Sequence, residues 1–266
     1  MLNKTLPTYV WFYAALFLSL LCHPKAGADT SMDVLKVGIL HAQEPPFVYF
    51  NPKDEIYAGI LIDMSEELGR RMGLKVEFIP TPRNKVEANI LSGEYNATFL
   101  AKSWVSIQEK VLFSEPFYYY SEYLYSTTPF ESSGAIESWA RGKTICTRDN
   151  FVHPVIDPLL KQNILNRLNV SVGAPIIKIM MKGRCDLALI DEFRKEWLVN
   201  NIPNMSDIYR TPNYVSKEFI SLMLNKDWQH RLQDFDSTII TMKQTGVIDE
   251  IVTRHSTRKL DYLDSM

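Results

Sequence analysis

Two stretches of this 266-residue chain share one pattern: ILSGEYNATFL at residues 90–100 and MMKGRCDLALI at residues 180–190. Each contains the end of a helix, a glycine, two further residues, Asn or Asp, and then an apolar strand. Glycine at that point is typical of a helix end, because it adopts the left-handed conformation easily. The repeated pattern therefore predicts two similar units within one chain.

The elements around the first stretch alternate between strands and helices. Apolar residues recur at every second position over 35–39 and at every fourth position over 64–72, which predicts a strand and then a helix. A strand at 74–78, a helix at 84–92 and a strand at 97–101 follow. This β-α-β-α-β order builds a parallel sheet covered by helices.

The same order returns around the second stretch. The sequence predicts a strand at 143–147, a helix at 155–168, a strand at 170–172, a helix opened by Pro175 and a strand at 186–190. Residues 104–130, between the two units, hold nine aromatic side chains. We expect most of them to pack as core, and the alternative is a cleft wall that stacks on a ligand.

The beginning of the chain has the composition of a secretory signal peptide. Lys4 precedes an apolar run of thirteen residues, Tyr9 to Leu21, and Ala26-Gly27-Ala28 is a small-x-small cleavage pattern. The run is shorter than the roughly 18 to 20 residues that cross a bilayer, which disfavours an uncleaved anchor. A lipoprotein with Cys22 at its cleavage site is a further alternative, disfavoured by the bulky Leu21. We predict a signal peptide at residues 1–28 and a periplasmic protein.

Charge and cysteine content narrow the class of protein further. The 29 Lys and Arg and the 31 Asp and Glu give a net charge of -2, without a basic cluster, so a nucleic-acid partner is excluded.

Beyond the leader only Cys146 and Cys185 remain, and an even pair in an exported protein indicates a disulfide. If the strands at 143–147 and 186–190 run level, however, the two Cα atoms lie about 13 Å apart, beyond the roughly 7 Å limit. This register predicts two reduced thiols.

Six short segments, taken in order, resemble one protein family. They are LKVG (35–38), PPF (45–47), GILID (59–63), FSEPFY (113–118), DLALID (186–191) and GVIDEI (246–251). Together they resemble the bacterial extracellular solute-binding proteins of family 3, the periplasmic amino-acid-binding type that serves ABC importers. The resemblance covers nearly all of the chain after the leader.

The resemblance implies an α/β fold of the two-lobed periplasmic binding protein kind (type II). Each lobe would be a mainly parallel sheet flanked by helices. Lobe 1 would comprise residues 29–125 with 223–266, and lobe 2 residues 127–220. Two crossing strands, near 123–127 and 220–224, would form the hinge, and ligand would favour the closed form.

Ligand contacts are expected beyond the carboxyl ends of the strands, as in other open parallel sheets. Asp191 matches the family carboxylate that pairs with a ligand's amino group, and it can also cap the helix that follows. Phe47 matches the aromatic residue of the family's Pro-Phe motif. The predicted ligand-binding residues are Glu44, Phe47, Arg83, Lys102, Trp104, Arg148, Asp149 and Asp191.

One family residue is missing from this sequence. The arginine that clamps an α-carboxylate falls on Ile107 or Gln108 here, and neither can pair with a carboxylate. We expect Arg83 to substitute, with Lys102 as the weaker candidate, while a solvated surface charge is the other interpretation of Arg83. Glu44, at a position often aromatic in the family, would contact a cationic or hydroxylated ligand or, more simply, face the solvent.

The loop at 148–150 opens the first helix of the second unit. Its backbone N–H groups could hold an anion, and Arg148 lies beside them. Asp149 has a helix cap as its alternative role. His41, at the end of the first strand, is expected to be a surface or capped residue.

Enzyme motifs are absent from the sequence, and no cofactor or metal site is expected. The sequence predicts a monomeric binding protein that takes a small polar, anionic or amino-acid-like ligand to an ABC permease. A sensory protein that reports ligand to a membrane receptor is the first alternative. The second is a periplasmic enzyme that resembles cyclohexadienyl dehydratase, with Glu44 or Glu192 as the general acid.

Overall fold

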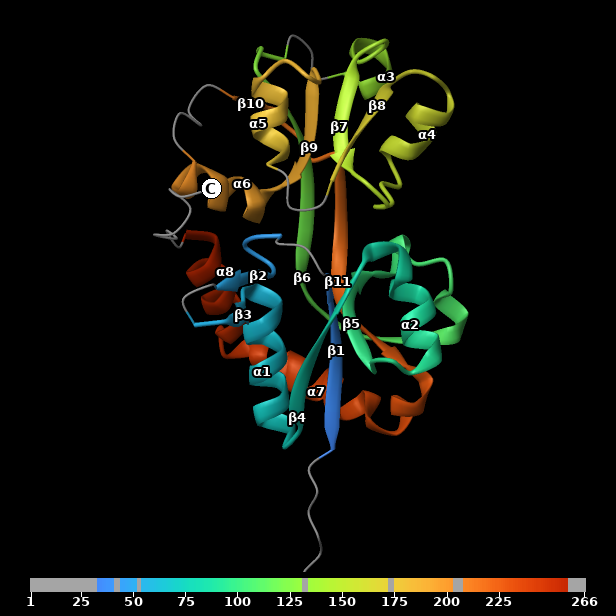
Figure 1. Ribbon diagram of the computed structural model, residues 1–266, viewed down its shortest axis with the longest axis vertical. Coiled ribbons are helices and arrows are strands. Elements are labelled where there is room, and N and C mark those ends of the chain that lie inside the picture. The colour runs from blue at the N-terminus through green and yellow to red at the C-terminus, as the bar shows by residue number, and fades with distance from the viewer. Residues whose placement is uncertain are drawn as a thin grey trace, which may run out of the picture. The chain divides into compact units, whose positions relative to one another are not determined.

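A computed structural model describes residues 33–40, 44–51, 54–130, 134–171, 175–202 and 208–257 (Figure 1). The predicted signal peptide and His41 lie outside these residues. The expectation of an α/β fold is confirmed: strands of one mixed sheet alternate along the chain with helices that cover it.

The first unit is a parallel half-sheet in the order β4-β1-β5, which we call the first half-sheet. β1 pairs with β4 over its full length and with β5 at Val37 and Gly38. All five residues of β5 are buried, as expected for a strand covered on both faces. The elements are β1 (Val34–Leu40), β2 (Tyr49–Asn51), β3 (Ile56–Ala58), α1 (Ile60–Met72), β4 (Lys75–Thr81), α2 (Val86–Ser92) and β5 (Ala97–Ala101).

The second unit repeats this plan in the order β9-β7-β8, here called the second half-sheet. β7 pairs in parallel with both neighbours, and all of β9 is buried. Two similar parallel units were predicted, and both are present. The elements are α3 (Ile136–Trp139), β7 (Thr144–Arg148), α4 (Ile156–Lys161), β8 (Asn166–Val170), α5 (Ile176–Met181), β9 (Leu187–Asp191), α6 (Glu192–Asn201) and β10 (Tyr209–Arg210).

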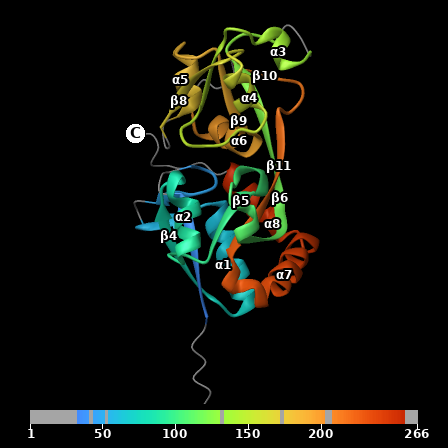
Figure 2. The ribbon, with the colours of Figure 1, turned by 90° about the vertical axis from the view of Figure 1, so that its right-hand side faces the viewer.

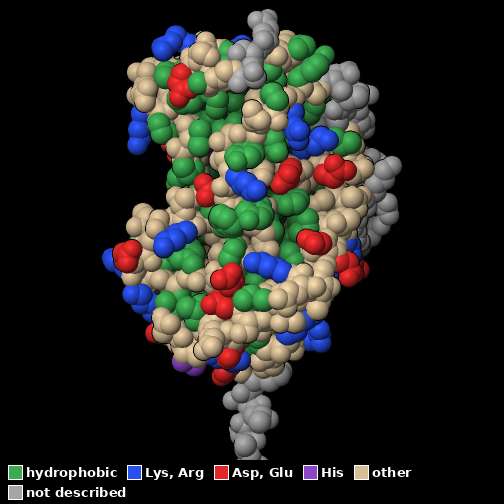
Figure 3. All heavy atoms as spheres, turned by 180° about the vertical axis from the view of Figure 1, so that it is seen from behind, with side chains coloured by type: hydrophobic (Ala, Val, Ile, Leu, Met, Phe, Trp, Pro, Cys, Tyr) green, Lys and Arg blue, Asp and Glu red, His purple; other side chains and the backbone are tan. Residues whose placement is uncertain are grey.

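Two long antiparallel strands join the half-sheets into one continuous sheet. They are β6 (Val111–Ser126) and β11 (Ser216–Asn225), and they lie between β5 and β9 in the strand order. Figure 2 shows them running side by side from one half-sheet to the other. The face that carries them, drawn in Figure 3, has hydrophobic side chains gathered between charged ones. Tyr119 of β6 and Phe219 of β11 are about half exposed and pack on each other, with ring centroids 4.7 Å apart.

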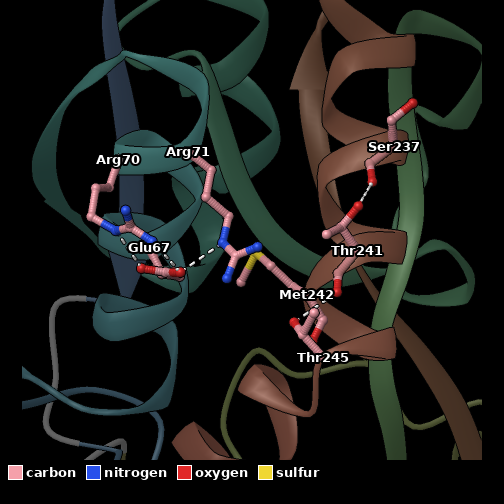
Figure 4. Close-up of polar contacts among 7 residues, drawn as sticks. All are labelled: Glu67, Arg70, Arg71, Ser237, Thr241, Met242 and Thr245. Atoms are coloured by element: carbon pink, nitrogen blue, oxygen red, sulfur yellow. Dashed lines mark hydrogen bonds and ion pairs between the residues drawn. The ribbon is translucent and has the colours of Figure 1, made fainter.

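The last two helices return to the first half-sheet. α7 (Leu232–Gln244) and α8 (Val247–Thr257) bury Phe235, Ile239 and Ile251 in the same cluster as α1. Figure 4 shows the facing surfaces of α1 and α7. On α1, Glu67 accepts hydrogen bonds from Arg70 and Arg71 at 2.8 and 2.6 Å.

One predicted helix is too long. The segment 155–168 was expected to be helical throughout, but α4 ends at Lys161 and Asn166 begins β8. Asn163 between them has a φ of 56°, a left-handed conformation that stops a helix. The apolar residues Ile164 and Leu165 are buried in the core by this turn rather than by a continuing helix face.

The prediction of two reduced thiols is wrong. Cys146 and Cys185 form a disulfide, with Cα atoms 5.8 Å apart. The prediction assumed that Cys185 lies in an extended strand, well below the level of Cys146. β9 begins only at Leu187, and the chain bends at Arg184 and Asp186, so Cys185 lies outside the extended strand. Both cysteines belong to one buried cluster.

Candidate functional site

Side chains from both half-sheets meet at the carboxyl ends of the parallel strands. Glu44 follows β1, Arg148 ends β7, and Asp191 ends β9 and begins α6. Glu44 and Asp191 are 3% and 0% exposed, and Arg148 is 8% exposed. Charged groups are rarely buried to this extent without partners, so their contacts define the site.

Glu44 lies between two arginines of the second half-sheet. Its Oε1 is 3.2 Å from Nε of Arg148, and its Oε2 is 2.5 Å from Nη2 of Arg194. The expectation that Glu44 faces solvent is wrong. A short turn in which the Phe47 and Val48 amides donate to the Glu44 carbonyl directs the side chain inward.

Asp191 holds the beginning of α6 and orients Arg194. One carboxylate oxygen accepts a hydrogen bond from the backbone N–H of Arg194 at 2.8 Å, which is the expected helix cap. The other lies 3.3 Å from the Arg194 guanidinium and accepts from the Tyr120 hydroxyl at 3.1 Å. Asp191 was predicted as both cap and ligand contact, and the cap is confirmed.

Burial and charge act in opposite directions on these groups. Burial raises the pKa of Asp191, although Arg194 opposes the shift. Burial alone would lower the pKa of Arg194, but the carboxylates of Glu44 and Asp191 outweigh it and raise that pKa. Burial lowers the pKa of Arg148, which Glu44 only partly offsets. Arg194 is therefore a permanently charged centre between two carboxylates.

Aromatic rings cover one side of this charged cluster. Phe47 packs against Tyr118, Tyr120 and Phe193, with ring centroids 5.8 to 6.5 Å apart, and the Arg194 guanidinium lies 5.4 Å from its centroid. Burial raises the pKa of both tyrosines. These side chains remain neutral hydrogen-bonding groups in an otherwise apolar wall.

Arg83 and Trp104 form a second group at the edge of the first half-sheet. The Arg83 guanidinium donates to the backbone carbonyl of Trp104 at 3.0 Å. It also lies 5.9 Å from the ring centroid of Phe151, a residue that follows β7 of the second half-sheet. The Trp104 ring packs edge-on against Tyr120 at 5.2 Å. Arg83 is only 9% exposed, so it is not the solvated surface charge of the alternative interpretation.

Two predicted residues lie apart from the charged cluster. Lys102 is exposed, and its backbone carbonyl accepts a hydrogen bond from Gln108. Asp149 is half-buried and accepts a hydrogen bond from the side chain of Asn150. Ligand contact by either residue remains a prediction.

Arg194 was not among the predicted site residues, and Tyr120 was predicted only as one of the nine aromatic residues at 104–130. Arg194 stands three residues after the predicted cap Asp191, where a long side chain can fold back toward the helix start. Tyr120 alternates with Tyr118 and Glu122 along β6, so all three side chains share one face. Both signals were present, but nothing local indicated that Glu44 would pair with Arg194.

Buried polar atoms remain in this region beyond the charged groups. Within the described part of the chain, Nε1 of Trp104 and Oγ1 of Thr147 are buried without a hydrogen-bond partner. Such atoms are uncommon in folded proteins and often mark a place for a bound molecule. The described residues offer no group of His, Cys, Asp and Glu suited to a metal ion.

The strand order is that of the type II periplasmic binding protein fold. The family model for bacterial extracellular solute-binding proteins, family 3, matches residues 35–258, and the chain belongs to this family. The sequence-based resemblance is confirmed. A comparison with curated proteins finds no match. Among the described residues, no helix is long and apolar enough to span a bilayer.

Solved structures share the fold at low sequence identity. The binding component of an ABC transporter from Wolinella succinogenes, complexed with lysine, is 16% identical with a TM-score of 0.70, over 85% of this chain and 96% of that one. The AvGluR1 ligand-binding domain complexed with glutamate is 16% identical with a TM-score of 0.68, over 86% and 96%. A histidine kinase sensor domain is 14% identical with a TM-score of 0.66, over 84% and 96%.

Proposed function

We propose that this protein is a periplasmic solute-binding protein that captures a small amino-acid-like ligand between its lobes for an ABC importer. The observation that supports this most is the buried cluster of Glu44, Arg148, Asp191 and Arg194. These groups come from both half-sheets, so a ligand that replaces or extends their contacts would bind both lobes at once.

The charge balance of the cluster favours a zwitterion. Two arginines face two carboxylates, so the cluster offers cationic partners for a ligand's carboxylate and an anionic partner for its amine. A ligand with a single unpaired charge would leave an uncompensated buried ion, which costs several kcal/mol. In this proposal Asp191 contacts the ligand's amine, and the rings of Phe47 and Trp104 contact its apolar part.

The lobes of this proposal are those expected from the sequence: residues 29–125 with 223–266, and residues 127–220. The hinge would lie at 123–127, where β6 ends, and at 220–224 of β11. The pairing register between β6 and β11 shifts near Ile220 and Ser221 of β11, opposite Tyr118 and Pro116 of β6. An irregular ladder has fewer regular hydrogen bonds to keep during bending, which supports a hinge there.

Binding without chemical conversion is the proposed activity. Of the two candidate general acids, Glu44 has both carboxylate oxygens facing arginines. Glu192 lines a pocket of about 410 Å³ that also includes Tyr119 and Phe219. Neither placement supports a proton donor beside a ligand at Asp191.

Mass spectrometry of small molecules that co-purify with the folded protein would identify the ligand, and calorimetry would then measure its affinity. We expect an amino-acid-like compound that binds with one-to-one stoichiometry. A compound that lacks either a carboxylate or an amine would contradict the proposed ligand class.

A sensory role is the second candidate, because a histidine kinase sensor domain has the same fold. The two roles differ in what a deletion strain loses. Loss of uptake of the identified compound would support transport, whereas normal uptake with a lost transcriptional response would support sensing.

A further inference from the structure

The carboxylate of Glu44 occupies a place that is suited to a ligand. It comes from a loop of the first half-sheet, whereas Arg148 and Arg194, which hold it at 3.2 and 2.5 Å, both belong to the second. We propose that these two arginines are a carboxylate-binding site, that Glu44 fills this site in the ligand-free protein, and that a ligand's carboxylate displaces it. This inference deepens the proposed function and rests on it for the nature of the ligand.

The arginines are held in place by contacts that do not involve Glu44. Arg148 donates from Nη1 to the backbone carbonyl of Ser171 at 2.9 Å. Arg194 is held by Asp191 through both its backbone N–H and its guanidinium. The site would therefore keep its geometry when Glu44 leaves, and a preorganised site binds its ligand without a further cost of ordering.

Glu44 can leave without unfolding its loop. Its backbone N–H donates to the carbonyl of Val48 at 2.7 Å, and its carbonyl accepts from the amides of Phe47 and Val48. These bonds fix the backbone while the side chain turns about its own torsions. Displacement is therefore a side-chain motion, which is fast compared with lobe movement.

Charge complementarity makes the exchange selective. If Glu44 moves out to water, the two buried arginines need another anion of the same charge, and a planar carboxylate fits two guanidinium groups. A ligand's carboxylate group replaces the two ion pairs that Glu44 gives up, whereas a neutral sugar or alcohol does not. Glu44 is thus a specificity-determining residue, because a ligand without a carboxylate cannot displace it.

Chemical rescue tests the site without knowledge of the natural ligand. The variant Glu44→Ala removes the carboxylate, and sodium acetate is the probe. We expect acetate at about ten times its dissociation constant to raise the melting temperature of this variant by about 3 to 6 °C, saturably. Sodium chloride at equal ionic strength should not reproduce the shift.

The chain contains a matched control. Glu67 also bridges two arginines, Arg70 and Arg71, but on the surface of α1 (Figure 4). Acetate should raise the melting temperatures of Glu67→Ala and of the wild type no more than chloride does. Equal acetate shifts in all three proteins would overturn the carboxylate site. Should Glu44→Ala not fold, Glu44→Gln also lacks the charge, and the same comparison applies to it.

A second measurement concerns the displacement. Calorimetry with L-lysine and L-glutamate should give at least several-fold tighter binding to Glu44→Gln than to the wild type, because the internal competitor is gone. Weaker binding to Glu44→Gln would mean that Glu44 contacts the ligand, and would overturn the displacement. If neither protein binds L-lysine or L-glutamate, the same comparison is made with the compound that co-purifies. If that compound is not amino-acid-like, the proposed function fails, and the acetate shift alone decides the carboxylate site.

Discussion

The carboxylate of Asp191 has three partners at once: the start of α6, the Arg194 guanidinium and the Tyr120 hydroxyl. A fully buried carboxylate is stable in the folded protein only when its oxygens are satisfied in this way. The same geometry leaves Arg194 fixed next to Glu44. One residue therefore links the stability of α6 to the shape of the candidate site.

The two roles of Asp191 can be separated by substitution. Asp191→Ala removes the cap and leaves Arg194 with one fewer carboxylate, so we expect a loss of about 3–5 kcal/mol in the free energy of unfolding. Asp191→Asn keeps an oxygen for the cap and should lose about 1 kcal/mol less. Urea unfolding of both variants measures this, and equal losses would contradict the capping role.

Acid should weaken the ion pairs of α1. A hydrogen bond from Arg70, helped by Arg71, lowers the pKa of Glu67 from 4.5 to about 2. Since the folded-state pKa is the lower one, the stabilisation by Glu67 is present above pH 4.5 and is lost as the pH falls toward 2. Urea midpoints of the wild type and Glu67→Gln should differ near neutral pH and converge over that range.

The control for this titration is Glu109→Gln. Glu109 is an exposed carboxylate for which the described residues provide no ion pair. The difference in urea midpoint between Glu109→Gln and the wild type should not change over the same pH range. A Glu67→Gln difference that persists below pH 2 would contradict the assignment.

At the scale of single residues, the sequence predicted which residues lie at the site better than it predicted which residues they contact. Asp191 was identified from the strand before it and from the helix after it, both of which are local patterns. Glu44 was expected to contact a ligand or to face the solvent, and its ion pairs were not predicted, because Arg148 and Arg194 lie more than a hundred residues away in the chain. Partners at such separations are determined by the fold, and no local pattern in the sequence contains them.

Among the elements, β1 depends on a residue without a side chain. A Cβ atom on Gly38 would lie 2.6 Å from the ring of Tyr95, which is fully buried and whose hydroxyl donates to the Val86 carbonyl. The ring cannot move away without breaking that bond. Close packing of this kind ties β1 to α2.

Gly38→Ala should therefore be destabilising. We expect a loss of about 1–3 kcal/mol in the free energy of unfolding, as is usual for an overpacked core. The double variant Gly38→Ala with Tyr95→Leu should cost less than the sum of the two single variants, because the smaller side chain leaves room. Additive losses in urea unfolding would contradict the clash.

The disulfide joins β7 to the turn before β9. It closes a loop with a sequence separation of 39 residues, and replacing both cysteines with serine should lower the free energy of unfolding by about 2–4 kcal/mol. Intact mass of the folded protein after alkylation without reductant should show no adduct at Cys146 or Cys185. Two adducts would mean that the thiols are free.

Element types were predicted well, and their ends were predicted where a glycine marks them. Glycines at 73 and 93 end α1 and α2 in left-handed conformations, as their positions predicted. Asn163 ends α4 in the same conformation, but asparagine is a weaker stop signal than glycine. The disulfide was missed for a related reason, since a bend before β9 has no strong sequence signature.

In the whole molecule, the charged cluster lies between two half-sheets that are joined by β6 and β11. A ligand at this place would contact both, so its binding energy would favour the form in which they approach each other. The family and the two-lobed plan could be predicted from the order of short motifs. The ion pairs of the cluster could not, because the position of the family's carboxylate-binding arginine falls on Ile107 or Gln108 here and the cluster's residues come from separate parts of the chain.

The central claim is that a small ligand binds at the buried cluster. Calorimetric titration with the compound that co-purifies with the protein tests this claim. The titration compares the wild type with Arg148→Ala and with Arg141→Ala, and Arg141 is an exposed arginine shortly before β7. Loss of a buried charged partner costs about 2–5 kcal/mol, so affinity should fall at least tenfold in Arg148→Ala and stay unchanged in Arg141→Ala. Equal affinity in all three proteins would contradict the account.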